Sequence, residues 1–160
     1  MAWYPVIFNN GGGGGSEFER LCYIEYVMRD TPEIPTIDTI DTSADYADYL
    51  SYDSATKKFT VLQTFTAIIT AWVEQDRAAG SPGEGAFYIN NSRVLGDFAT
   101  PSAAAGSKAG DSVFFNFQIG DTFWSYTPSS NGWPAQRLKV YKTETLPVSD
   151  IYSFTDENSG

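Results

Sequence analysis

Segments of alternating apolar and polar residues between positions 50 and 124 constrain the fold more than any other feature of this sequence. The longest of them covers residues 64–74. Its regularly spaced apolar positions are Phe65, Ala67, Ile69, Ala71 and Val73. The opposite side is mostly threonine, with Ile68 and Trp72 as apolar exceptions. Because a period of two is typical of a strand with one buried face, this segment is predicted to be a half-buried β-strand.

Similar short segments follow one another, with turn residues between them. The other predicted strands are 50–53, 59–62, 86–90, 93–98, 113–119, 122–126 and 137–143. The predicted connections include a loop at Ser54–Lys58, a hairpin turn at Asn91-Ser92, a small-residue loop at 99–110 and a turn at Gly120-Asp121. Within 113–119, the side chains expected on one face are Val113, Phe115, Phe117 and Ile119. Closely spaced strands without intervening helices predict an all-β antiparallel sandwich or barrel.

Two earlier segments allow more than one interpretation. Residues 17–30 fit a helical face, but they also alternate through Cys22, Ile24 and Tyr26, and their aromatic and β-branched content favours a strand. Residues 36–49 repeat Ile-Asp-Thr and are expected to form either one face of a helix or an acidic loop at the end of a sheet.

The charge composition excludes several kinds of partner. The chain has a net charge of −10 and no histidine. A nucleic-acid-binding protein needs a basic surface, and an anionic membrane repels an acidic protein, so neither partner is expected. No apolar stretch is long enough to cross a membrane as a helix, and residues 1–8 lack the basic start of a signal peptide.

The residue types present also argue against catalysis. Without histidine, the chain has no Ser-His-Asp or Cys-His arrangement and no zinc site of the Cys/His type. The five glycines at 11–15 lack the Lys-Ser/Thr of a phosphate-binding loop. Carboxylates suited to a glycosidase are Glu74, Asp76, Glu84 and Asp97, but acids at the ends of a sandwich more often cap loops. Cys22, the single cysteine, is expected to be a buried structural thiol. No enzymatic activity is predicted.

Several strand-and-turn features resemble one family. Tyr52–Thr56 with Lys58–Val61 resembles the early hairpin of the complement-type globular heads, which are tumour necrosis factor-like jelly rolls. The passage from Asp111 through Gly120-Asp121 to Trp124, and the hairpin at 86–94, are also similar to that family. The sequence departs from it where Gln63-Thr64 replaces the usual Pro-Gly. The resemblance implies a jelly-roll sandwich, a homotrimer about a threefold axis, and a binding role without catalysis.

Bacteriophage tail and capsid spikes reuse this kind of head, so the resemblance implies a structural virion protein on the particle surface. Such a protein serves as a capsid decoration or head fibre, or contacts the host at the tail tip. The chain then divides into an apolar anchor with a glycine tether (1–16), a leading strand with an acidic connector (17–45) and the jelly-roll head (46–160). The expected partners are copies of itself, capsid or tail proteins and a host-surface glycan. The alternative is a monomeric carbohydrate-binding β-sandwich.

Three groups of residues are candidates for function. The particle anchor is predicted to consist of Trp3, Tyr4, Val6, Ile7 and Phe8. Trp133 and Tyr126 are candidates for stacking on a sugar ring, whereas Trp124, on an alternating strand, is expected in the core or in a subunit interface. No organic cofactor is expected, and calcium is the one metal to consider, because hard cations prefer carboxylate oxygens. Its candidate ligands are Asp38, Asp41, Asp45 and Asp48.

Overall fold

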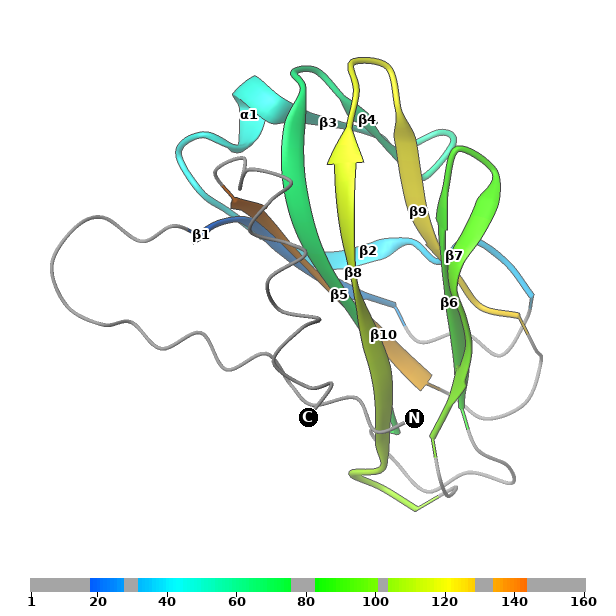
Figure 1. The fold of residues 1–160 in the computed structure, drawn as a ribbon. Coiled ribbons are helices and arrows are strands. Elements are labelled where there is room, and N and C mark those ends of the chain that lie inside the picture. Colours follow the sequence, from blue (N-terminus) through cyan, green and yellow to red (C-terminus); the bar gives the residue numbers. More distant parts are fainter. Residues whose placement is uncertain (1–17, 28–31, 76–82, 101–103, 129–133, 144–160) are drawn as a thin grey trace, which may run out of the picture.

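The computed structural model describes residues 18–27, 32–75, 83–100, 104–128 and 134–143, apart from the side chains of 96–98 and 134. Within these residues the chain forms two packed five-stranded sheets and one helical turn (Figure 1). The first sheet has the order β2 (Ile37–Thr42), β1 (Phe18–Tyr26), β10 (Pro134–Thr143), β5 (Phe65–Gln75) and β8 (Lys108–Phe117). The second has the order β3 (Leu50–Asp53), β4 (Lys58–Val61), β9 (Thr122–Tyr126), β6 (Glu84–Ile89) and β7 (Ser92–Ala99). All these neighbours pair antiparallel, which confirms the predicted all-β antiparallel sandwich.

The two ambiguous segments both supply strands to the first sheet. Residues 18–26 form β1, which lies between β10 and β2, so the interpretation as a strand is confirmed. Residues 37–42 form β2, and the prediction of a helical face or a loop for 36–49 is wrong there. Only a single helical turn, α1 (Tyr46–Tyr49), follows. β2 is an edge strand and is largely exposed, so it can contain many polar residues. These polar residues are the reason why the sequence pattern did not indicate a strand here.

The longest strand matches its predicted pattern. In β5 the five regularly spaced apolar residues of the alternation are all buried. β5 pairs with β10 on one side and β8 on the other, so it lies inside the first sheet. The exceptions Ile68 and Trp72 lie on the face turned away from the core, where both are partly exposed.

Turn positions shift by one or a few residues from those predicted. The β3–β4 loop is Ser54–Lys57, because Lys58 already pairs with Asp53. β8 begins at Lys108, which shortens the predicted loop at 99–110. The alternation in β8 ends at Phe117, and Ile119 lies in the β8–β9 turn with 71% of its surface exposed. The prediction that Ile119 shares one strand face with Val113, Phe115 and Phe117 is therefore wrong.

The β6–β7 hairpin turns at Asn90-Asn91, not at Asn91-Ser92 as predicted. Ile89 pairs with Ser92, and both asparagines have positive φ angles of 49° and 64°. A two-residue turn of this kind needs positive φ at both positions, which asparagine and glycine tolerate best. Asn90 also holds β9, because its side chain donates to Asp121 over 2.8 Å and accepts from the Thr122 amide over 2.9 Å.

The different roles of these asparagines lead to opposite expected results. Asn91→Gly should stabilise the fold by about 0.5 kcal/mol, since glycine adopts positive φ without steric cost. Asn90→Gly should destabilise it by about 1–3 kcal/mol, because Asp121 and Thr122 lose their partner. Urea unfolding of the two variants measures both changes. Equal effects of the same sign would contradict this assignment of roles.

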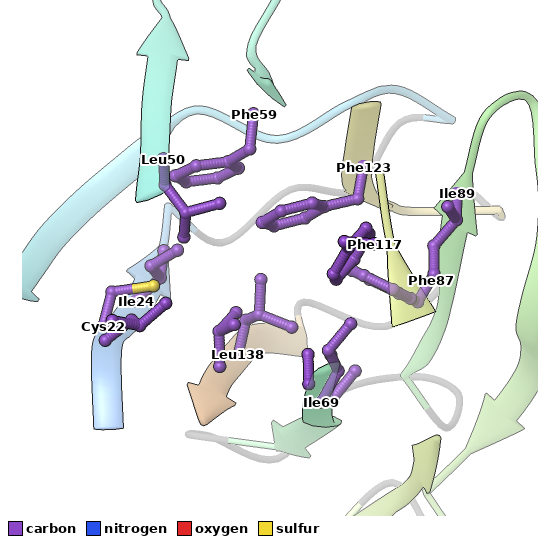
Figure 2. Packing of buried hydrophobic residues seen from close by; sticks show 14 of the residues in the cluster. Cys22, Ile24, Leu50, Phe59, Ile69, Phe87, Ile89, Phe117, Phe123 and Leu138 are labelled. Carbon is purple, nitrogen blue, oxygen red and sulfur yellow. The ribbon is translucent and has the colours of Figure 1, made fainter. Parts of the chain in front are cut away.

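Aromatic rings join the two sheets in the core (Figure 2). Phe123 on β9 stacks on Phe59 of β4, with ring centroids 4.9 Å apart and an interplanar angle of 6°. Phe117 on β8 meets Phe123 at 5.4 Å from the opposite sheet, and Phe87 on β6 meets it at 5.9 Å. All four side chains are fully buried. These rings hold the two sheets together by apolar burial and ring packing.

Candidate functional site

The outer side of the first sheet carries a group of large apolar side chains that do not contribute to the core. We call this surface the aromatic face, and its members are Tyr23, Ile68, Trp72, Phe114 and Tyr141. Tyr141 on β10, Ile68 on β5 and Phe114 on β8 lie directly opposite one another on neighbouring strands. Phe114 is 42% exposed. Since exposed apolar patches mark contact surfaces, this face is the strongest candidate for an interaction site.

A stacked ring pair occupies the middle of the aromatic face. Tyr23 on β1 and Trp72 on β5 are separated by β10, and their rings lie 6.1 Å apart with an interplanar angle of 20°. The ammonium of Lys139 on β10 lies 5.5 Å from the Trp72 ring and 5.7 Å from the Tyr23 ring. The two rings therefore attract this cation through their π faces.

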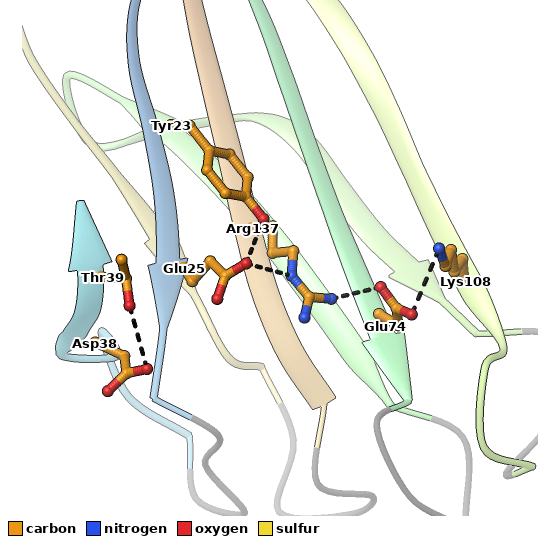
Figure 3. A network of polar contacts seen from close by, with 7 residues as sticks. All are labelled: Tyr23, Glu25, Asp38, Thr39, Glu74, Lys108 and Arg137. Atoms are coloured by element: carbon orange, nitrogen blue, oxygen red, sulfur yellow. Dashed lines mark hydrogen bonds and ion pairs between the residues drawn. The ribbon is translucent and has the colours of Figure 1, made fainter. Parts of the chain in front are cut away.

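A row of alternating charges crosses the sheet beside the rings (Figure 3). Arg137 on β10 lies between two carboxylates, with its nitrogens 3.4 Å from Glu25 on β1 and 2.5 Å from Glu74 on β5. Lys108 on β8 extends the row and lies 3.4 Å from Glu74. The hydrogen bond donated by the Tyr23 hydroxyl lowers the pKa of Glu25, and nearby Arg137 lowers it further. Partial burial in turn raises the pKa of the Tyr23 hydroxyl.

These contacts make the aromatic face nearly neutral. Its carboxylates, Glu25 and Glu74, lie among the cations Arg137, Lys108 and Lys139. The whole chain carries a net charge of −10, so most of its excess negative charge lies elsewhere. Copies of an acidic chain repel one another. A nearly neutral apolar surface is where that repulsion is weakest.

The sequence indicated this face only through Ile68 and Trp72, the two apolar exceptions in β5. Tyr23, Phe114 and Tyr141 were not predicted as site residues. Their grouping depends on the insertion of β10 between β1 and β5. That neighbour relation joins segments from the two ends of the described chain, and no local pattern reveals it.

The four candidate calcium ligands do not converge. Asp41 forms an ion pair with Arg20, and Asp45 lies 3.4 Å from Lys142. Asp38 accepts a hydrogen bond from Thr39. In the described parts of the chain, no three His, Cys, Asp or Glu side chains group closely enough to hold a metal ion. Those residues also contain no helix long and apolar enough to span a membrane.

The tryptophans occupy different environments. Trp124, expected in the core or in a subunit interface, is 6% exposed but lies on the outer side of the second sheet, because its neighbour Phe123 faces the core. Tyr126 lies on the same outer side, where its ring meets the Tyr88 ring edge-on at 5.8 Å. Trp133 lies outside the described residues, and so do all the predicted anchor residues. Those anchor positions are Trp3, Tyr4, Val6, Ile7 and Phe8.

The carboxylates considered as glycosidase residues and the Cys22 thiol lie in different parts of the structure or outside the described residues. Glu74 belongs to the charged row of the first sheet, whereas Glu84 lies on β6 of the second sheet. The side chains of Asp76 and Asp97 lie outside the described residues. Cys22 is fully buried, and burial raises the pKa of its thiol to about 12. Such a thiol is not a nucleophile at neutral pH.

No protein-family model matches this sequence, and no curated protein matches it. Solved structures are similar in fold. The globular domain of zebrafish complement 1qA protein has a TM-score of 0.54 and 11% sequence identity, and the match covers 81% of this chain and all of that domain. Rabbit GITRL has a TM-score of 0.47 and 13% identity, with 80% of this chain and 98% of that chain covered. Eiger TNF from S. frugiperda has a TM-score of 0.46 and 7% identity, with 80% and 94% covered.

Of these three structures, only the complement domain exceeds a TM-score of 0.5, so the statement about the fold rests on this domain. At 11% identity the likeness concerns the fold and not the activity. The two five-stranded antiparallel sheets and the likeness to this domain show that the chain has a tumour necrosis factor-like jelly-roll fold. The predicted fold class is confirmed.

Proposed function

We propose that this chain is a non-catalytic binding head that assembles as a homotrimer through the aromatic face. The observation that carries the proposal is an apolar, charge-balanced surface on an otherwise strongly acidic chain. A threefold arrangement is what the resemblance to complement-type heads implies. The likeness in fold is compatible with this role, since jelly rolls of this type need no catalytic residues to bind a partner.

The proposal extends to the particle that carries the head. We infer a bacteriophage virion protein, displayed on the particle surface as a decoration, a head fibre or a tail-tip protein. The support is the order of the sequence: an apolar peptide at residues 1–8, five glycines, and then the jelly roll. Deleting residues 1–16 should leave the assembly of the head intact and abolish its incorporation into particles. Loss of the fold on deletion would contradict an anchor role.

The oligomeric state provides the direct test. Multi-angle light scattering at micromolar concentration should give about three times the chain mass of 17.6 kDa. Because the contact is mainly apolar, the mass should persist when the salt concentration rises. A mass of one chain at all concentrations would overturn the proposal.

The same surface supports a second candidate function. Paired aromatic rings beside charged hydrogen-bonding groups are also the pattern of a sugar-binding surface. In that case the chain is a monomeric carbohydrate-binding sandwich. Trp72→Ala distinguishes the two functions: it should weaken assembly if the face is an interface, and abolish glycan binding by a monomer if the face binds sugar.

A further inference from the structure

A continuous stack of four side chains lies on the outer side of the second sheet. Its members are Lys58 on β4, Trp124 on β9, Tyr88 on β6 and Arg93 on β7. Tyr88 lies opposite both Trp124 and Arg93 on the neighbouring strands, and Lys58 comes from β4 on the other side of β9. The Lys58 ammonium lies 3.8 Å from the Trp124 ring centroid. The rings of Trp124 and Tyr88 are parallel within 4° and 5.5 Å apart. Arg93 lies over the far side of Tyr88 and donates to its hydroxyl over 3.2 Å.

Lys58 is a fixed positive charge without a carboxylate partner among the described residues. Asp53 pairs with it across β3 and β4, but the Asp53 carboxylate accepts hydrogen bonds from the Ala55 amide and the Thr56 hydroxyl. These bonds lower the pKa of Asp53 and keep it in its own turn. The chain has a net charge of −10, yet this lysine is held against an indole ring and pairs with no described carboxylate. Its ammonium group is therefore a place where an anionic ligand can bind.

The stack also limits how a ligand is recognised. Lys58 and Tyr88 cover the two faces of the Trp124 ring, and only 6% of this residue is exposed. A sugar ring therefore has no free indole face on which to stack. Thr60 and Thr122 lie opposite each other in the next row, and both are partly exposed. Recognition here depends on a cation beside a row of hydroxyl groups.

We propose that this surface binds a saccharide that carries a carboxylate, such as a sialylated or uronic-acid glycan. The Lys58 ammonium pairs with the carboxylate, and the threonine hydroxyls bond the sugar hydroxyls. The inference deepens the proposed function, because it gives the head a class of ligand. The outer side of the second sheet faces away from the aromatic face, so it stays accessible when the head assembles through that face (Figure 1).

The test uses the full chain on an array of acidic oligosaccharides, each printed beside its neutral counterpart, followed by calorimetric titration of the best binder. The wild-type chain should bind an acidic member at least about tenfold more tightly than its neutral counterpart. Lys58→Gln should lose about tenfold in affinity, and Lys58→Arg should retain most of it. The binding should also weaken at high salt.

Lys57→Gln is the matched control, because it removes the same charge one residue away. Lys57 lies 3.6 Å from Glu33 and bonds the Ile34 carbonyl, so it already has partners. This variant should bind within about twofold of wild type. If no acidic glycan exceeds its neutral counterpart, or if Lys57→Gln loses as much affinity as Lys58→Gln, the proposal fails. Light scattering of the same variants reports assembly separately, so a failure here is distinct from a failure of the trimer.

Discussion

Replacing Phe114 by glutamate is expected to turn the assembled chain into a folded monomer, with about one third of the wild-type mass in light scattering. Phe114 is 42% exposed and lies beside Ile68 and Tyr141 on the aromatic face. Burying a carboxylate there without a partner costs several kcal/mol for each copy, of the order that a central interface residue contributes. The core is not touched, because Phe114 faces away from it, so circular dichroism and the thermal midpoint of the dissociated chain should still report a folded protein.

Ile119→Glu is the matched control for this change. Ile119 is 71% exposed in the β8–β9 turn, a short distance along the chain from Phe114 but off the aromatic face. It introduces the same charge into the same acidic chain, so any general repulsion between copies is equal in the two variants. Ile119→Glu should keep the wild-type mass. If both variants dissociate, charge alone is responsible and the aromatic face is not the interface.

The fold was largely predictable because its signals are local. The period-two pattern of residues 64–74 gave the central strand β5, and the apolar side of that pattern became core. β2 escaped prediction because it is an exposed edge strand, and an exposed edge need not alternate. The turn at Asn90-Asn91 was displaced by one residue because asparagine and serine both favour turns, and only the backbone angles distinguish them.

The candidate site was much less predictable, since it depends on which strands become neighbours. Tyr23 and Trp72 meet only because β10 places β1 and β5 on either side of itself. Trp124 was expected in the core or in an interface, because alternation locates a buried side chain without saying what buries it. In the structure Lys58 and Tyr88 cover it from the outside. Long-range pairing of this kind is not encoded in a short window of sequence.

Gly110 on β8 allows this strand to approach β5 closely at Trp72, although its exposed position in a strand does not suggest such a role. It pairs with Trp72 across β5 and β8, in the row that also contains Arg137 and Glu25. A Cβ atom at this position would lie 2.3 Å from the Trp72 Cβ and 2.5 Å from the Ala71 carbonyl oxygen. Both distances are far inside van der Waals contact, and neither neighbour is the end of a flexible side chain. The backbones of the two strands must therefore separate if any side chain is added.

Gly110→Ala is expected to destabilise the fold by about 2–4 kcal/mol and to weaken assembly at the same time. The clash displaces β8 from Trp72, which costs packing in the first sheet and disturbs the aromatic face. Gly120→Ala separates this effect from an ordinary glycine replacement. Gly120 has a φ of +89°, and a Cβ atom added there would meet nothing within 4 Å, so alanine costs only backbone strain, about 1 kcal/mol. Urea unfolding with light scattering should find Gly110→Ala the more damaging of the two, and only Gly110→Ala should change the oligomer mass. Equal losses in the two variants would mean that β8 can shift without cost, and that its close approach to Trp72 is not required for the aromatic face.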